Sequence, residues 1–210
     1  MAKASIPEPA YRNRLRADVI EKASQILVQE GLEAVQARRI AAAAECSVGT
    51  LYNLFGDIDG LMLAVNAATL ARLGERVVAA SGDMHGVPLV ERLMRLARAY
   101  MQFAVENHAR WDAVFRHRLR PGKEVPQSYV DDQQRLLGVI AKALADTLDD
   151  ETQRMATART LFGAVHGIVV LALDNRLGGS LRHELDQQLE RIVRLAADGL
   201  EAERQRSQPN

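Results

Sequence analysis

Hydroxyl and amide side chains recur in the segment SVGTLYNLF, which runs from Ser47 to Phe55. A hydroxyl group donates hydrogen bonds to phosphate oxygens, and an asparagine amide pairs bidentately with adenine. In a helix, Leu51 and Phe55 lie one turn apart and face a core, which leaves the polar side chains toward solvent. The chemistry that these residue types and spacings predict is recognition of a nucleic-acid duplex by a short helix.

Two short helices are needed to position these groups. The preceding string RRIAAAAEC indicates an alanine-rich helix and a tight turn, and Ser47 can cap the next helix by accepting a hydrogen bond from a backbone N–H. Such a pair is a helix-turn-helix, which places its second helix in a DNA major groove. We expect one side of that helix to carry Val48, Gly49, Thr50, Tyr52 and Asn53.

Strand signals are scarce in the chain, because aromatic residues make up only 4% and apolar residues recur at helical spacing. The sequence therefore predicts an all-α protein with about nine helices. Two prolines and the lack of periodicity near the N-terminus indicate a flexible arm. The expected helices are 13–30, a short one that contains Arg38, the recognition helix, one from about 57 to 80, and then 88–107, 109–118, 127–148, 151–175 and 183–204.

The formal net charge is zero, which argues against nonspecific coating of nucleic acid, although a specific DNA-binding protein needs only a local basic patch. The single cysteine, Cys46, excludes an intrachain disulfide and suits a reducing cytoplasm. No signal peptide is visible, and the apolar run Leu161–Leu173 is too short to span a bilayer. We therefore expect a cytoplasmic protein without a membrane partner, in which this run forms a buried helix.

Motifs of catalytic and metal sites are missing from the sequence, which has no glycine-rich phosphate loop, no H-E-x-x-H and no Cys or His pair at zinc-finger spacing. His108 and His117 are separated by an interval that is off the four-residue repeat of a helix face. We therefore predict no enzyme and assign no catalytic residue, no metal ligand and no cofactor.

The string IAAAAECSVGTLYNLF resembles the DNA-binding signature of TetR-family transcriptional regulators, whose usual form is I-A-x-x-A-G-V-S-x-G-T-L-Y-x-H-F. The resemblance implies a regulator, most often a repressor, that binds double-stranded operator DNA through one helix-turn-helix per protomer. The phosphate-binding residues that it implies are Arg38, Thr50 and Tyr52. The residues that it implies at base edges or at the helix start are Ser47, Val48, Gly49 and Asn53.

In the second half, FAVENHARWDAVF and ARTLFGAVHGIVVLAL are similar to the ligand-binding domain of a TetR subgroup with a tryptophan-histidine-glycine motif, in which Phe162 replaces the tryptophan. This similarity implies a homodimer built on the last two helices and a small-molecule effector that releases a palindromic operator. The candidate pocket residues are Tyr100, Phe103, Trp111, Phe115, Phe162 and His166. Each of them can instead be an ordinary core residue.

The implied domain organisation is an arm (1–12), a helix-turn-helix domain (13–58), a connecting helix (59–80) and a ligand-binding and dimerisation domain (88–206). The last helix carries an apolar stripe that suits either packing within the chain or a four-helix dimer interface. The members of this stripe are Leu185, Leu189, Ile192, Ala196 and Leu200.

Three positions depart from the family pattern, since Glu45 replaces the turn glycine, Leu54 replaces the histidine and Ile58 replaces a lysine that reaches a phosphate. A side chain held at positive φ is strained, and Asp57 and Asp59 make the start of the fourth helix acidic. An alternative function therefore stays open, namely a helical small-molecule-binding protein or enzyme with a degenerate DNA-binding module.

Two interpretations are open for Arg12, Arg14 and Arg16, which lie near the predicted arm. They either follow the minor groove or the phosphates of DNA, or they form the solvated start of a helix.

Overall fold

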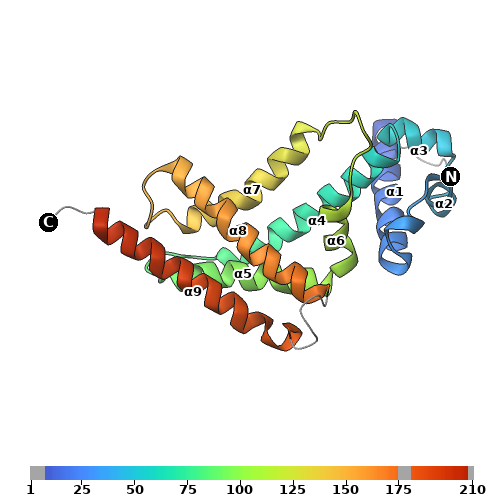
Figure 1. The fold of residues 1–210 in the computed structure, drawn as a ribbon. Coiled ribbons are helices and arrows are strands. Elements are labelled where there is room, and N and C mark those ends of the chain that lie inside the picture. Colours follow the sequence, from blue (N-terminus) through green and yellow to red (C-terminus); the bar gives the residue numbers. More distant parts are fainter. Residues whose placement is uncertain (1–7, 175–180, 208–210) are drawn as a thin grey trace, which may run out of the picture. The chain divides into compact units, whose positions relative to one another are not determined.

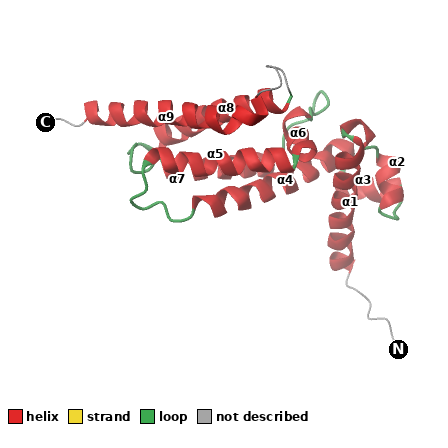
Figure 2. Cartoon of the chain, turned by 90° about the horizontal axis from the view of Figure 1, so that it is seen from below, coloured by secondary structure: helices red, strands yellow, loops and turns green. Residues whose placement is uncertain are grey.

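The computed structural model describes residues 8–174 and 181–207 (Figure 1), and the side chains of residues 181–183 and 207 lie outside that description. Every regular element in the described residues is a helix (Figure 2), which confirms the all-α prediction. The elements are α1 (Glu8–Glu30), the short 3-10 helix η1 (Leu32–Ala34), α2 (Ala37–Ala43), α3 (Val48–Phe55), α4 (Ile58–Ser81), α5 (Leu89–Glu106), α6 (His108–Arg116), α7 (Gln127–Ala143), α8 (Glu151–Leu173) and α9 (Leu181–Ser207).

The first helix begins earlier than predicted, at Glu8 rather than at Asn13. Pro9 is compatible with a first turn because the backbone N–H that it lacks would have no helical partner there. Residues 8–12 of the expected flexible arm are therefore helical, and residues 1–7 lie outside the described residues. The predicted stop is confirmed, since Gly31 follows α1 with a positive φ of 87°.

Two compact units divide the chain. The N-terminal unit comprises Met1–Leu70 and Asn107–Tyr129, and the C-terminal unit comprises Ala71–Glu106 and Val130–Asn210. This division differs from the one expected from the sequence, because α4 runs from one unit into the other and α6 belongs to the N-terminal unit. The physical reason is that Ala113 of α6 is part of the core that α1, α2 and α3 form.

In the N-terminal unit, side chains from five helices, α1, α2, α3, α4 and α6, meet in one apolar core. Leu27 of α1, Ile40 of α2 and Leu51 of α3 are almost completely buried, and the first turns of α4 add further apolar side chains. This packing fixes α3 against α1 and α2 and thereby determines which face of α3 stays in solvent. The other buried members of this core are Val19, Ala23, Ile26, Val35, Ala41, Ala44, Leu61, Met62, Val65 and Ala113.

In the C-terminal unit, α5, α8 and α9 pack together, and the guanidinium of Arg98 on α5 donates two hydrogen bonds, of 2.7 and 2.8 Å, to the Asp186 carboxylate on α9. The buried stripe of α9 consists of Leu185, Leu189, Val193 and Ala197. It differs from the predicted stripe, because both faces of this helix carry apolar residues and the core takes only one of them. The remaining predicted members, Ile192, Ala196 and Leu200, are half-buried.

The apolar helix α8 is less buried than predicted. Among the described residues, α8 is the one unbroken helix that is long and apolar enough to cross a membrane. The helices α3 and α4 reach that length and composition only when they are counted together, and they are bent relative to each other. Soluble core helices meet the same criterion, but only 22% of the apolar window of α8 is buried inside the chain. Most of its apolar side chains are half-buried, so the expectation of a buried helix is wrong for the single chain.

Candidate nucleic-acid interface

Ser47 caps α3 as predicted. Its backbone is extended, and its Oγ accepts a hydrogen bond of 3.0 Å from the backbone N–H of Thr50. The helix ends at Gly56, whose φ of 79° is readily available to glycine. A serine cap and a glycine stop thus define an eight-residue recognition helix.

The faces of α3 largely follow the expectation. Leu51 is completely buried, and Ser47, Gly49, Tyr52 and Asn53 are exposed. A polar surface with one phenol and one amide therefore faces solvent.

Two predicted contact residues of α3 are less exposed than expected. Val48 and Thr50 are both half-buried, and Val48 packs against the core. For Val48 this differs from the predicted solvent-facing position, because its side chain packs against the apolar core of the N-terminal unit.

The hydroxyl groups of Ser47 and Thr50 lie 2.8 Å apart. Either hydroxyl can donate to the other, and Ser47, whose Oγ accepts from the backbone N–H of Thr50, can give its own proton to Thr50 Oγ1. In that arrangement the Thr50 hydroxyl keeps its proton for an acceptor outside the protein. Such a pre-oriented donor suits a phosphate oxygen.

The turn between α2 and α3 has the positive φ that the sequence predicts at Glu45. Glu45 has a φ of 49° and is the only non-glycine residue with positive φ in the described part of the chain. The next residue, Cys46, donates its backbone N–H to the carbonyl oxygen of Ala41 at 2.9 Å. Burial raises the pKa of the Cys46 thiol, and the Asp18 carboxylate raises it further, so the thiol is poorly reactive and serves packing.

Basic side chains flank α3 on two sides. Arg38, in the first turn of α2, is exposed and forms no ion pair among the described residues, whereas its neighbour Arg39 pairs with Glu30. On the other side, Arg12 donates to the backbone carbonyl oxygen of Asn53 at 3.2 Å. Cations near the last carbonyl groups of a helix are favourable because these groups carry partial negative charge.

Arg16 lies with its guanidinium 5.1 Å from the ring centre of Phe55, which is partly buried against the core of the N-terminal unit. Arg12 and Arg16 are thus residues of the α1 surface that contact the C-terminal end of α3. This favours the helix-start interpretation of these two arginines over a free arm.

The connection from α3 to α4 is short and tightly packed. Asp57 caps α4, as predicted, by accepting a hydrogen bond of 3.0 Å from the backbone N–H of Gly60. A Cβ atom at Gly60 would lie 2.0 Å from the carbonyl oxygen of Phe55, so a larger residue does not fit. Ile58, which stands where the family pattern has a lysine, is half-buried against the core.

An ion cluster at the start of α4 was not foreseen from the sequence. The Asp59 carboxylate is almost completely buried and accepts a hydrogen bond of 2.8 Å from Arg120 Nε, and Lys123 Nζ lies 3.2 Å from it. Lys123 also pairs with Asp57. The predicted acidic helix start is therefore corrected, because cations from the segment after α6 neutralise both carboxylates. Sequence reasoning missed them since these partners lie far apart along the chain.

His117 adjoins this cluster, with its Nε2 3.8 Å from the Asp59 carboxylate. Burial lowers the pKa of His117, and the attraction of Asp59 offsets only part of that effect. The imidazole is thus held mainly in its neutral form.

The predicted pocket residues fall into both units. In the C-terminal unit, the hydroxyl of Tyr100 lies 2.7 Å from His166 Nδ1, Phe162 meets Tyr100 edge to face, and Phe103 is buried. Burial lowers the pKa of His166. These four predicted pocket residues all belong to the C-terminal unit.

The other two predicted pocket residues, Trp111 and Phe115, belong to the N-terminal unit, where their ring centres lie 5.4 Å apart. Trp111 is buried and Phe115 is partly exposed. The six residues of the predicted pocket are thus divided between the two compact units, because α6 packs with α1.

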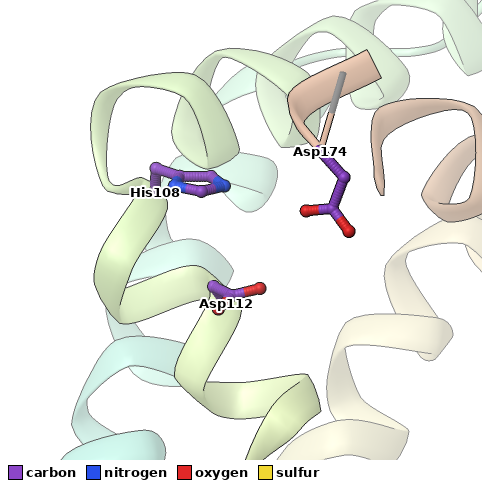
Figure 3. Close-up of side chains that lie close together, drawn as sticks. All are labelled: His108, Asp112 and Asp174. Atoms are coloured by element: carbon purple, nitrogen blue, oxygen red, sulfur yellow. The ribbon is translucent and has the colours of Figure 1, made fainter. Parts of the chain in front are cut away.

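His108 and Asp112 lie one turn apart on the same side of α6, whereas Asp174 follows the last residue of α8 (Figure 3). The Asp112 carboxylate accepts a hydrogen bond of 2.6 Å from Arg116 within the same helix. An ordinary ion pair along a helix accounts for Asp112, and the two α6 residues by themselves provide fewer ligands than a zinc site needs.

Comparisons with known proteins cover both halves of the chain. The family described as "Bacterial regulatory proteins, tetR family" matches residues 19–65, and the family described as "Tetracyclin repressor-like, C-terminal domain" matches residues 93–196. No curated protein matches the chain.

Several solved structures share the fold. A protein of unknown function from Rhodococcus sp. RHA1 is 19% identical, with a TM-score of 0.71 over 88% of this chain and 94% of that one. A TetR-family transcriptional regulator from Streptomyces coelicolor is 22% identical, with a TM-score of 0.68 over 94% and 90%. Mycobacterium smegmatis BioQ is 23% identical, with a TM-score of 0.61 over 89% and 97%.

The first family match spans the helix-turn-helix and its serine cap, and the second spans most of the helices beyond it. These matches decide against an enzyme with a degenerate DNA-binding module. The chain belongs to the TetR family of bacterial regulatory proteins and is a DNA-binding transcriptional regulator.

Proposed function

We propose that this regulator is a cytoplasmic repressor, which binds a palindromic operator as a homodimer and leaves it when a small-molecule effector binds. The observation that carries the proposal is the exposed polar face of the capped helix α3. A two-fold dimer presents two such helices to successive major grooves, which accounts for a palindromic site.

Within each half-site, phosphate contacts come from the exposed Arg38, from Tyr52 and from the oriented hydroxyl of Thr50. The amide of Asn53 reads a base edge, and the exposed Gly49 lets the helix backbone approach the groove. The N-cap Ser47 holds the helix start, while Val48 contributes only the part of its surface that the core leaves uncovered.

In vitro selection of operator sequences tests these roles. Asn53→Ala should relax the preference at one operator position and cost about 1 to 3 kcal/mol there, because it removes a base contact. Thr50→Val should weaken binding to all sequences alike, since phosphates carry no sequence information. Gln153→Ala, which removes an exposed amide at the start of α8, is the matched control. Identical base preferences in wild type and Asn53→Ala would exclude the assignment.

The proposed dimer interface is the surface of α8 and α9 that the single chain leaves uncovered. A groove of about 640 Å³ lies there, lined by Ile168 of α8 and by residues of α9 that include Ile192 and Leu195. Leu195 is 64% exposed, an unusual degree for a leucine beside other apolar groups. Gly163 and Gly167 face open space within the described structure, so a helix of the second protomer has room to approach.

The proposed effector site lies around Tyr100, Phe103, Phe162 and His166 in the C-terminal unit. Aromatic rings supply apolar contact, and the Tyr100 hydroxyl and the His166 imidazole can exchange their mutual hydrogen bond for bonds to a ligand. An effector that binds only the DNA-incompetent form shifts the population away from the operator-bound form.

A gel shift with DNA adjacent to its own gene tests the regulator as a whole. Retarded DNA that competitor DNA of random sequence does not displace is the expected result. If competitor DNA of random sequence and equal length displaced the protein as well as the specific DNA does, the operator proposal would be contradicted.

A further inference from the structure

We propose that residues 117–123, the segment that follows α6, supply the cations by which the start of α4 binds the operator backbone. In this proposal Asp57 and Asp59 position these cations and do not simply repel the DNA. The segment is a phosphate-binding surface that adjoins the recognition helix.

The position of the cluster relative to α3 supports contact with phosphates. An eight-residue helix is about 12 Å long, which is close to the width of the major groove. When such a helix lies in the groove, the residues that directly follow its C-terminal end are therefore near the groove edge, where the phosphates lie. Asp57 and Asp59 follow α3 at this place, and Lys123 and Arg120 are bound to them.

The exposure of the cluster members gives it a positive outer surface. The Asp59 carboxylate is 6% exposed, whereas the side chain of Arg120 is 57% exposed and that of Lys123 is 33% exposed. Arg118 is also exposed and forms no ion pair among the described residues, and Glu124 is the adjacent acidic residue. The buried Asp59 thus places one negative charge inside. At the surface, where the Asp57 side chain is 36% exposed, the three cations Arg118, Arg120 and Lys123 outnumber Asp57 and Glu124.

The hydrogen-bonding capacity of the two cations leaves donors for DNA. Arg120 uses Nε on Asp59, and a guanidinium has five N–H groups in total. Lys123 has three donors and binds the two carboxylates. Because the carboxylates already hold these long side chains in place, less rotamer entropy is lost when a phosphate binds. Ile58 contributes no charge here, so the segment after α6 takes over that task.

Salt titrations of operator binding test the contact directly. Lys123→Gln and Arg120→Gln should each make the slope of log K against log salt shallower by about 1.8, because the dimer loses one phosphate contact of about 0.9 in each half-site. Base preferences should stay unchanged. Arg135→Gln, a matched change of an exposed cation on α7, should leave the slope as in wild type. Wild-type slopes for both cluster variants, with unchanged melting temperatures, would overturn the proposal.

Removal of a carboxylate distinguishes positioning from repulsion. Asp57→Asn keeps a helix cap, since asparagine caps as well as aspartate, and it deletes one negative charge. If the carboxylate only repelled phosphates, this variant would bind the operator more tightly. Our proposal predicts weaker binding and a shallower salt slope, because Lys123 loses one of the two carboxylates that hold it and keeps only Asp59.

In the Lys123→Gln background, Asp57→Asn should no longer weaken binding, because the side chain that Asp57 positions is gone. Tighter binding of the single variant Asp57→Asn, or the same loss in both backgrounds, would refute the positioning role. Duplex DNA of random sequence is a second probe, since a phosphate contact must appear in nonspecific binding as well.

Discussion

Glu45 occupies a backbone conformation that favours glycine, with a φ of 49° in the turn that leads into α3. Glu45→Gly should raise the free energy of unfolding by up to about 1 kcal/mol, because the Cβ atom that causes the strain is removed. Urea unfolding monitored by circular dichroism measures the change.

The control for this substitution is Glu33→Gly, at an exposed position of η1 without positive φ. There the added backbone freedom of the unfolded chain should lower stability. A loss of stability in both variants would mean that the turn at Glu45 is not strained.

Local features of the helix-turn-helix were predictable from single residues. The Ser47 cap, the buried Leu51 and the positive φ of Glu45 each depend on neighbours within a few residues, and all three are confirmed. The packing of Val48 against the core was not predictable, because it depends on how the first turn of α3 meets the preceding helices.

At the scale of elements, α9 shows why the sequence left the interface undecided. Apolar residues lie on two faces of this helix, and sequence periodicity alone does not reveal which face packs within the chain. In the structure Leu189 is completely buried among its own helices, whereas Ile192 and Leu195 line the uncovered groove.

This distinction gives a prediction for the dimer. Leu195→Glu should yield folded monomers that no longer bind the operator, because it places a carboxylate in the interface without disturbing the core. Leu189→Glu should instead unfold the chain. Light scattering and circular dichroism together separate the two outcomes.

Val78→Glu provides the control, since Val78 on α4 is also an exposed apolar residue but lies outside the groove. It should leave the protein dimeric. A dimeric Leu195→Glu variant would place the interface on another surface.

At the scale of the whole molecule, two half-buried histidines, His117 and His166, make stability depend on pH. Burial lowers the pKa of His117 in the N-terminal unit and of His166 in the C-terminal unit. A histidine in the unfolded chain takes up a proton near pH 6.5, whereas these two histidines in the folded chain take it up only at lower pH. The unfolded state therefore binds more protons, and stability is lost as the pH falls below this value.

We expect the free energy of unfolding to decrease between about pH 7 and pH 5, and the double variant His117→Gln with His166→Gln to show a weaker decrease. Denaturant titrations at several pH values measure both curves. Equal slopes in the variant and the wild type would show that these two imidazoles do not cause the dependence.

The all-α class and the order of the helices followed from composition and periodicity, but the assignment of helices to compact units did not. Arg120 and Lys123 reach Asp59 across a long stretch of chain, and α6 joins the N-terminal unit through Ala113. Such pairings carry no periodic signal, because only the folded chain brings their members together.

Gly60 and Gly49 should both be intolerant to mutation, but for different physical reasons. A Cβ atom there would collide with the carbonyl oxygen of Phe55, whereas at Gly49 it would meet only Ser47 Oγ, at an ordinary 3.6 Å. In a saturation library, selection for soluble protein alone should already remove nearly all variants at position 60 and retain small residues at position 49. Selection for operator binding should then remove the variants at position 49 as well, so that one glycine is required by the fold and the other by the DNA.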